Sequence, residues 1–269
     1  MEYRFRLKYL APGTPTYVWQ TLQEYNSLST CSWTPDTAQD YILYVYAREK
    51  GSKTTYDLYK EMPYSVKQPV SQVVFTTSLE SPIGVGTPVK LIATPTGGGT
   101  LEYKFYATYQ DSSSATHVEL IQDFATNNIV TWTPKVAATY NPLTVVVREK
   151  GKTGEFNFDM AREIFGYEVV PAVSSLKLYT IPENFIPVGF AVDIIAEATG
   201  GGNLEYQFKA KYLSGTAYVW QTLQAYGPES LCAWSPTEAH SYIIYAYARE
   251  VGTTIPYKVY RELAFTVTP

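Results

Sequence analysis

The feature that most constrains this chain is one stretch of alternating apolar and polar residues that occurs three times. Residues 200–212 read GGGNLEYQFKAKY, residues 97–109 read GGGTLEYKFYATY, and residues 1–9 read MEYRFRLKY. Because successive side chains of a β-strand point to opposite faces, this period of two predicts a strand with one buried face and one face in water. Three copies of one strand predict three copies of one domain, the first without its opening part.

A tryptophan marks the same point in each copy. Trp33, Trp132 and Trp234 each precede a Thr-Pro or Ser-Pro pair. Successive tryptophans are roughly 100 residues apart, which is a common domain size. The chain is therefore predicted to contain three repeats, over residues 1–68, 69–171 and 172–269.

Short runs rich in β-branched and aromatic residues fill each complete copy, with glycine and proline turn signals about every 8–12 residues. This pattern predicts an all-β fold of tandem immunoglobulin-like β-sandwich domains, each with about seven strands. The first copy begins at the alternating strand. Residues 1–68 are therefore expected to lack the two N-terminal strands and to supply the last five.

A tyrosine follows each of the three tryptophans by eight residues, just before an apolar strand. In immunoglobulin-like sandwiches, a tyrosine near the start of the sixth strand donates a hydrogen bond to upstream backbone, an arrangement called the tyrosine corner. The tryptophans are expected to fill the space between the two sheets. The predicted structural core includes six aromatic residues: Trp33, Trp132, Trp234, Tyr41, Tyr140 and Tyr242.

Residue types suited to catalysis or metal binding are scarce in the sequence. The two histidines, His117 and His240, lie in non-equivalent predicted loops, and no motif supports a Ser-His-Asp or Cys-His grouping. Paired ligands for zinc are lacking, and Asp111 is expected to cap a turn rather than to hold calcium. The triple glycines at 97–99 and 200–202 precede no helix, so they are expected to form turns rather than a phosphate site. We expect no enzyme activity, catalytic residue, cofactor site or metal site.

Charge and hydrophobicity argue against two classes of partner. The formal net charge of −4 gives no basic field, which argues against nucleic acid. The sequence has no apolar run of about 18 residues or more, so no membrane span is predicted. The residues after Met1 do not resemble a signal peptide.

An outward aromatic surface is the remaining candidate site. Alternation along the strand that follows Tyr41 or Tyr242 turns two tyrosines outward, and the opening strand turns lysines and arginines outward. If these strands are neighbours, the cations lie beside tyrosine rings and stabilise the sheet. The same surface is a candidate platform for a sugar or a protein, together with two tryptophans that the second repeat lacks. Its residues are Trp19, Trp220, Tyr44, Tyr46, Tyr245 and Tyr247.

Several of these motifs resemble one family. The GGGxLEYxF strand, the WQTLQ segments at residues 19–23 and 220–224, and the tryptophan step with its following tyrosine resemble the tandem triple-tyrosine-motif repeats of bacterial proteins. These repeats are similar to the three-Y domains of bacterial sensor proteins. The resemblance covers nearly the whole chain and implies a modular immunoglobulin-like repeat that is extracellular or on the cell surface. The second repeat departs from it, with residues 116–119 in place of the tryptophan segment.

The expected function is a non-enzymatic array that serves as a spacer, adhesion or assembly module, including one that forms filaments. Two alternatives stay open: carbohydrate binding through exposed aromatic residues, and the ligand-sensing region of a bacterial receptor. The expected partner is protein, through self-association or neighbouring domains of a longer array, or else a glycan. The strands missing from the first repeat have two explanations. The chain is a fragment of a longer array, or another chain donates the strands.

Overall fold

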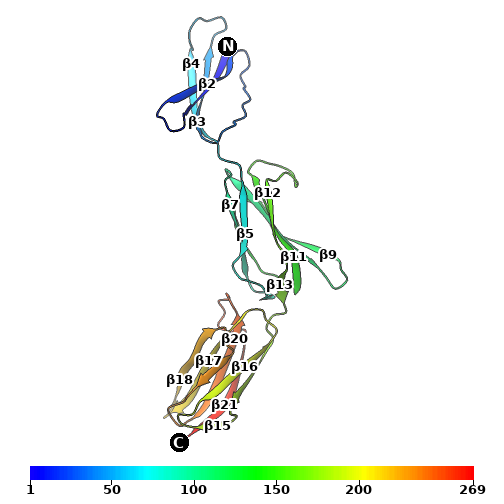
Figure 1. Ribbon diagram of the computed structural model, residues 1–269, viewed down its shortest axis with the longest axis vertical. Coiled ribbons are helices and arrows are strands. Elements are labelled where there is room, and N and C mark those ends of the chain that lie inside the picture. Colours follow the sequence, from blue (N-terminus) through cyan, green and yellow to red (C-terminus); the bar gives the residue numbers. More distant parts are fainter. The chain divides into compact units, whose positions relative to one another are not determined.

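The computed structural model describes residues 1–269, and every regular element in it is a β-strand (Figure 1). The chain divides into two compact units. The first unit comprises residues 1–73, 95–101 and 148–160, and the second comprises residues 74–94, 102–147 and 161–269. Each of the five sheets lies inside one of the ranges 1–68, 69–171 and 172–269, which we name the first, second and third repeat. The chain has no helix long and apolar enough to cross a membrane.

The first repeat forms one antiparallel sheet. Its strands are β1 (Glu2–Leu10), β2 (Tyr17–Asn26), β3 (Asp40–Arg48) and β4 (Leu58–Ser65). They lie in the order β2-β1-β3-β4, so the alternating strand β1 is central. Alternation turns Phe5 and Leu7 to one face of the sheet and Arg6 and Lys8 to the other. We call these the inner face and the outer face.

The second repeat contains two sheets. Its strands are β5 (Gln72–Thr77), β6 (Ile83–Gly84), β7 (Val89–Thr96), β8 (Leu101–Gln110), β9 (Thr116–Ala125), β10 (Ile129–Trp132), β11 (Ala138–Glu149), β12 (Met160–Ile164) and β13 (Tyr167–Val170). The smaller sheet has the order β10-β7-β5. The larger has the order β6-β13-β11-β8-β9, with β12 paired to β11.

The third repeat contains the same two layers. Its strands are β14 (Ser175–Ile181), β15 (Phe185–Pro187), β16 (Val192–Thr199), β17 (Leu204–Ser214), β18 (Ala217–Gly227), β19 (Leu231–Trp234), β20 (Ser241–Glu250) and β21 (Val259–Thr268). They form the sheets β14-β16-β19 and β15-β21-β20-β17-β18. This is the two-sheet arrangement of an immunoglobulin-like sandwich. The fold is therefore all-β and consists of immunoglobulin-like domains in tandem, as the sequence predicted.

The core of the third repeat lies between its two sheets. Leu176 and Ile194 of the smaller sheet belong to one buried cluster with Phe208, Ile244 and Phe265 of the larger sheet. Phe208 and Ile244 are completely buried. They stand on β17 and β20, which pair in register, so their burial follows from the alternation of these two strands.

A tyrosine corner is present in each repeat. The hydroxyls of Tyr41, Tyr140 and Tyr242 donate to the carbonyl oxygen of the residue four positions upstream, at 2.9, 3.2 and 3.0 Å. All three side chains are buried, and burial raises the pKa of Tyr140 to about 12. Trp132 and Trp234 are buried beside them, with ring centroids 4.8 and 4.9 Å from Tyr140 and Tyr242.

The first repeat has four strands rather than the five that the sequence predicted. Residues 30–35, which include Trp33, adopt no regular structure. In the other repeats the equivalent segments are the strands β10 and β19, which pair with β7 and β16. The first repeat has no strand equivalent to β7 or β16. The backbone of residues 30–35 therefore lacks a partner, and no second sheet forms. Trp33 is consequently half-buried on one sheet instead of enclosed between two.

The first two glycines of each triple glycine serve as turn residues. Gly200 and Gly201 have φ angles of 76° and 86°, a region that favours glycine. A Cβ at Gly200 would lie 2.6 Å from the carbonyl oxygen of Ala172. The amide of Gly201 donates to the carbonyl of Pro171 at 2.8 Å. The turn therefore closes on the segment that enters the repeat, and these glycines are turn residues as the sequence predicted.

Within the second unit, Gly202 and Asn203 lie against the turn between β5 and β7. The backbone amide of Asn203 donates to the carbonyl of Pro82 at 3.0 Å, and its side-chain amide donates to the carbonyl of Glu80 at 3.1 Å. A Cβ at Gly202 would overlap the Pro82 carbonyl and lie 2.5 Å from the Cα of Ile83. This contact between the second and third repeats therefore depends on glycine at position 202.

Glu250, at the end of β20, closes the same contact. Its side chain is buried, and its Oε2 accepts a hydrogen bond from the amide of Gly202 at 3.1 Å. A Cβ at Gly84 of the second repeat would overlap its Oε1. Burial raises the pKa of the Glu250 carboxyl, because a charged carboxylate loses its hydration there.

Candidate functional site

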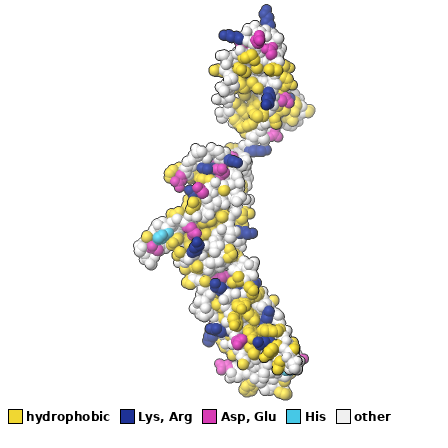
Figure 2. Space-filling view, turned by 180° about the vertical axis from the view of Figure 1, so that it is seen from behind, with side chains coloured by type: hydrophobic (Ala, Val, Ile, Leu, Met, Phe, Trp, Pro, Cys, Tyr) yellow, Lys and Arg dark blue, Asp and Glu magenta, His cyan; other side chains and the backbone are white.

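The inner face of the first repeat's sheet lies open. Two β4 side chains on this face, Met62 and Tyr64, are 52% and 47% exposed. Their register with β3 places them where the third repeat has Leu263 and Phe265, and Phe265 is only 2% exposed. Hydrophobic side chains gather over one side of the first repeat, at the top of Figure 2. Leu7 and Tyr41 on the same face are buried, so a face that is core in the third repeat is in part surface in the first.

A hollow of about 490 Å³ lies in this open inner face. Phe5 and Leu43 in its wall are half-buried, whereas their counterparts in the third repeat, Phe208 and Ile244, are completely buried. The hollow can therefore take up apolar side chains that would complete the burial of its wall. We use the name open inner face for six of the apolar side chains that line it: Phe5, Leu22, Trp33, Leu43, Met62 and Tyr64.

Reasoning from the sequence predicted an incomplete sandwich, but its list of core residues included only Trp33 of these six. A signal for the others was available on β4. Met62 and Tyr64 alternate with Glu61 and Pro63, which is the pattern of a strand with one apolar face. A short run of alternation at an edge is a weak signal, because exposed apolar residues are common on protein surfaces.

The outer face of the same sheet carries the predicted aromatic surface. β1 lies between β2 and β3, so Arg6 and Lys8 stand between Trp19 and Tyr44. The Arg6 guanidinium carbon lies 4.6 Å from the centre of the Trp19 ring, and Lys8 Nζ lies 5.2 Å from the centre of Tyr44. The strands are thus neighbours, and the cations lie beside aromatic rings at distances typical of cation–π contacts. We call this surface the cation–aromatic face.

Two tyrosines of this surface are covered, which differs from the expectation that they form its exposed part. The side chains of Tyr44 and Tyr245 project from the outer side of their sheets but are only 6% and 7% exposed. The ring centroid of Trp19 lies 5.0 Å from that of Tyr44, and the Lys8 side chain also lies against it. Burial raises the pKa of the Tyr44 hydroxyl. These two rings are therefore packing residues and cannot offer a free face to a ligand.

The indoles form the exposed part of the cation–aromatic face. Trp19 and Trp220 are 42% and 51% exposed. Tyr46 and Tyr247 are half-buried at the next outward position of β3 and β20, and burial raises the pKa of both hydroxyls. A ligand would therefore contact the tryptophans first.

The third repeat reproduces this arrangement. The ring centroids of Trp220 and Tyr245 are 5.1 Å apart, close to the 5.0 Å of the first-repeat pair. Lys211 Nζ lies 5.0 Å from the Tyr245 centroid and 5.2 Å from the Trp220 centroid. The Tyr245 and Tyr247 rings are stacked with centroids 6.1 Å apart. Equal geometry in two repeats means that the local sequence determines this surface.

The second repeat does not share the surface. Its residue at the tryptophan position is Val118, which pairs with Thr108 as Trp19 pairs with Lys8. Thr144 and Val146 replace the two outward tyrosines, and both are buried. The sequence predicted this difference from the same substitutions.

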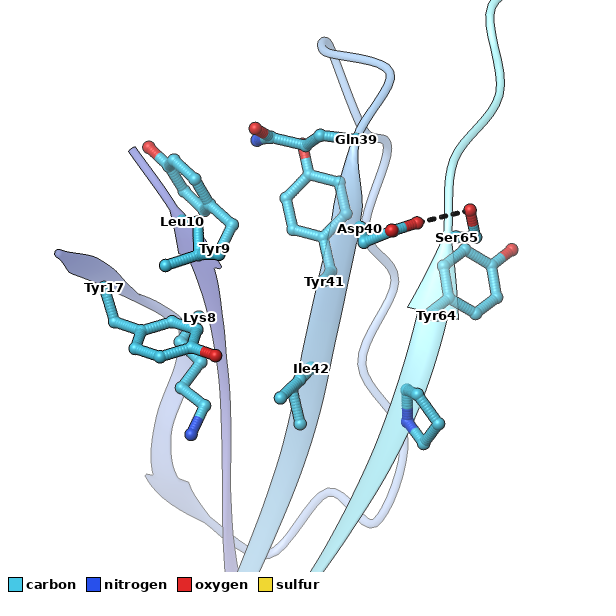
Figure 3. Close-up of a pocket in the computed structure, with 11 residues that line it drawn as sticks. Lys8, Tyr9, Leu10, Tyr17, Gln39, Asp40, Tyr41, Ile42, Tyr64 and Ser65 are labelled. Atoms are coloured by element: carbon cyan, nitrogen blue, oxygen red, sulfur yellow. Dashed lines mark hydrogen bonds between the residues drawn. The ribbon is translucent and has the colours of Figure 1, made fainter. Parts of the chain in front are cut away.

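Another hollow, of about 620 Å³, lies at one end of the first sheet (Figure 3). Its polar groups bond to one another. The Tyr41 hydroxyl donates to the carbonyl of Thr37 and accepts from Gln39 Nε2 at 3.0 Å. Ser65 Oγ donates to Asp40 Oδ1 at 2.5 Å. No histidine or thiol lines this hollow.

Both histidines stack on aromatic rings, although His240 lies in the loop before β20, as the sequence predicted. His117 lies on β9, and its ring stacks on Tyr109 with centroids 5.0 Å apart. His240 stacks on Tyr212, the equivalent tyrosine of the third repeat, at 4.2 Å. The Nε2 of His117 lies 2.7 Å from Oδ2 of Asp111. No group of three or more His, Cys, Asp or Glu residues that could hold a metal ion is present.

Comparisons with known proteins find similar chains among solved structures. Neither a protein-family model nor a curated protein matches the chain. Among solved structures, the chain is similar to the crystal structure of the FN1–FN3 domains of chicken CNTN1. The identity is 12% and the TM-score is 0.41, over 100% of this chain and 89% of that chain. A likeness at this level carries no argument about activity or partners.

Proposed function

We propose that the chain is a non-enzymatic structural module of tandem immunoglobulin-like repeats that assembles with other polypeptide through its first repeat. One observation carries the proposal: the open inner face presents core side chains to solvent, among them Met62 and Tyr64 at about half exposure. Exposed apolar patches of this kind are typical of protein interaction sites. An extracellular location stays a prediction from the family resemblance.

Physical reasoning supports assembly over a passive spacer. The counterparts of these side chains in the third repeat are buried by a second sheet, which removes their apolar surface from water. In the first repeat these side chains stay exposed, which costs roughly 25 cal/mol of stabilising free energy for each Å² of apolar surface left in water. Association with another chain would recover this burial.

Light scattering at several protein concentrations tests the proposal, followed by negative-stain microscopy of the associated species. We expect concentration-dependent association that is lost in Met62→Lys, because an ammonium group cannot be buried in an apolar interface. Val118→Lys is the matched control, since Val118 is an exposed strand residue of the second repeat. A monomer that is insensitive to dilution would overturn the proposed assembly.

Carbohydrate binding is the second candidate, favoured by the two exposed indoles. Trp19 and Trp220 stand at equivalent positions with the same lysine neighbours, and apolar sugar faces stack on such rings. A glycan array with the wild type and with Trp19→Ala and Trp220→Ala tests it. Binding that each substitution weakens, and that Val118→Ala leaves unchanged, would support this function. Binding that is equal in all variants would exclude it.

A further inference from the structure

We propose that the cation–aromatic face binds acidic polysaccharides, with one site in the first repeat and one in the third. The inference rests on the carbohydrate-binding candidate and names the class of sugar. In each site, exposed aromatic rings stack on the apolar faces of neighbouring sugar units. A lysine ammonium binds the carboxylate or sulfate group that one of these units carries.

Each site has two exposed aromatic rings on an edge strand. Tyr17 lies two positions before Trp19 on β2. Tyr218 lies two positions before Trp220 on β18. Side chains two positions apart on a strand project from the same face, about 7 Å from each other. The tyrosines are 48% and 60% exposed, so neighbouring units of one sugar chain can contact both rings of a site.

A lysine ammonium lies beside both rings of each site. Lys8 Nζ is 4.7 Å from the centre of the Tyr17 ring and 5.3 Å from the centre of the Trp19 ring. In the third repeat the corresponding distances from Lys211 Nζ are 5.0 and 5.2 Å. A sugar stacked on these rings therefore has a positive charge within reach of its substituents.

The charge of each lysine is not neutralised by an ion pair. Arg4, which projects from the same face of β1, pairs with Glu24 at 3.3 Å. Lys8 and its counterpart Lys211 form no ion pair with a carboxylate. Interaction with a tyrosine hydroxyl raises the pKa of both lysines, so both stay charged at neutral pH. An anionic group on a ligand can therefore act as the counter-ion.

A carboxylate near each site limits the position of the acidic group. Glu61 lies opposite Tyr44 in the β3–β4 pair, and Glu262 lies opposite Tyr245 in the β20–β21 pair. Paired residues project from one face, but the tyrosine strand separates each carboxylate from the strand that carries the lysine. The acidic group of the sugar is thus expected over the edge-strand rings, away from these carboxylates.

The second repeat shows that the sheet does not require this surface. It has Thr108 in place of the lysine and Val118 in place of the tryptophan. Even so, β8 lies between β9 and β11 as β17 lies between β18 and β20. The lysine and the indole are therefore not needed to bring the three strands together. Exposed aromatic side chains that the fold does not need are available to a ligand.

The direct experiment is isothermal titration of the full chain with oligogalacturonate and with its carboxyl-reduced form, in which each carboxylate has become a hydroxymethyl group. We expect the acidic form to bind about tenfold more tightly or better, because the reduced form lacks the charge-assisted hydrogen bond. Dextran sulfate and dextran form a second pair, which tests a sulfate group in the same way. Added salt should weaken binding of the acidic forms, because it screens exposed charges.

Substitutions of lysine locate the binding charge. Lys8→Gln and Lys211→Gln should each weaken binding of the acidic form, and the double variant should lose the preference for it. Lys211→Arg keeps the charge and should keep the preference. Lys177→Gln is the matched control, because Lys177 also lies beside a ring, 4.6 Å from the centre of Tyr179, but pairs with Glu197. This control should bind as the wild type does.

The possible results separate this inference from the carbohydrate-binding candidate. Equal binding of the acidic and carboxyl-reduced forms, weakened by Trp19→Ala and Trp220→Ala, would overturn the acidic specificity and leave carbohydrate binding standing. Binding of dextran sulfate that depends on neither the lysines nor the tryptophans would be unspecific attraction and would also overturn the inference. A failure to bind any of the four saccharides would do the same.

Two further results would overturn the inference and the carbohydrate-binding candidate together. One is the absence of binding on the glycan array as well as in the titrations. The other is binding to vesicles of anionic lipid that Trp19→Ala and Trp220→Ala abolish, with no saccharide bound. That result would assign the cation–aromatic face to a membrane surface.

Discussion

At the scale of single residues, each corner tyrosine combines a buried ring with a bonded hydroxyl. The hydroxyl of Tyr242 donates to the carbonyl of Glu238 at 3.0 Å. Tyr242→Phe should lower the unfolding free energy of the third repeat by about 1 kcal/mol, because it removes one hydrogen bond and keeps the ring. Urea unfolding measures the change. Tyr260→Phe, at an exposed ring of the same repeat, should change stability by less than about 0.5 kcal/mol. Equal losses would contradict the prediction.

Glu250 gives the contact between the second and third repeats a pH dependence of definite sign. Burial raises the pKa of its carboxyl above the usual value of 4.5, so the folded state holds its proton more tightly than the unfolded chain. The corresponding stability is fully present below pH 4.5 and is lost as the pH rises through the folded pKa. This loss should vanish in Glu250→Gln.

The measurement is thermal unfolding of wild type and Glu250→Gln from about pH 4 to pH 7. The variant should gain stability relative to the wild type as the pH rises across this range. Other carboxyls titrate there as well, and the pKa of Glu197 is lowered by its hydrogen bond from Tyr179. Their effects are common to both proteins and cancel in the difference. A difference that stays constant with pH would contradict the assignment.

At the scale of elements, the second sheet decides how much a tryptophan contributes to stability. Trp132 lies enclosed between two sheets, and Trp33 packs on one. Trp132→Ala should cost about 3–5 kcal/mol, because it leaves a cavity in a closed core. Trp33→Ala should cost less than about half of that, since water already reaches the ring. Chemical denaturation followed by residue-level exchange compares the two repeats. Equal costs would mean that the first repeat has a closed core.

The alternation of polar and apolar residues was sufficient to predict the strands with one wet face. The alternating stretches at residues 2–9 and 204–212 fall within β1 and β17. The loss of the strand at residues 30–33 could not be predicted in the same way, because its residues resemble those of β10 and β19. Strand formation depends on a neighbouring strand, and the composition of a segment does not indicate whether that neighbour is present.

The candidate site was predicted in part for a related reason. Alternation identifies the side of the sheet from which Tyr44 and Tyr245 project, and both do project outward. It does not say that an indole and a lysine from neighbouring strands lie over the Tyr44 ring. Cover of this kind depends on rotamers across two strands, which the spacing along one strand does not contain.

At the scale of the whole molecule, the repeats share structural features of one fold but present different surfaces. The corner tyrosine is present in all three repeats, whereas the cation–aromatic face is present in the first and third only. The open inner face occurs in the first alone. Features shared by every repeat serve the fold, and features confined to one repeat are where a specific interaction is expected. This reasoning agrees with the proposal that the first repeat carries the assembly surface.

The contact between the second and third repeats depends on one glycine, and Gly202→Ala tests it. The added Cβ would meet the backbone of Pro82 and Ile83, which cannot turn aside as a flexible side chain can. We expect the two repeats to separate locally, so that the amide of Asn203, bonded to the Pro82 carbonyl, exchanges about tenfold faster or more. The core of the third repeat should keep its exchange rates.

The matched control for this substitution is Gly99→Ala, at the equivalent position of the second repeat. There a Cβ would lie 3.2 Å from the carboxylate oxygen Oε2 of Glu149, which can move away. Its effect on neighbouring amides should therefore be small. If Gly202→Ala leaves the Asn203 amide as slow as in the wild type, the contact tolerates a side chain. The contact would then depend on the other residues of the junction, with Glu250 and its neighbour Gly84 first among them.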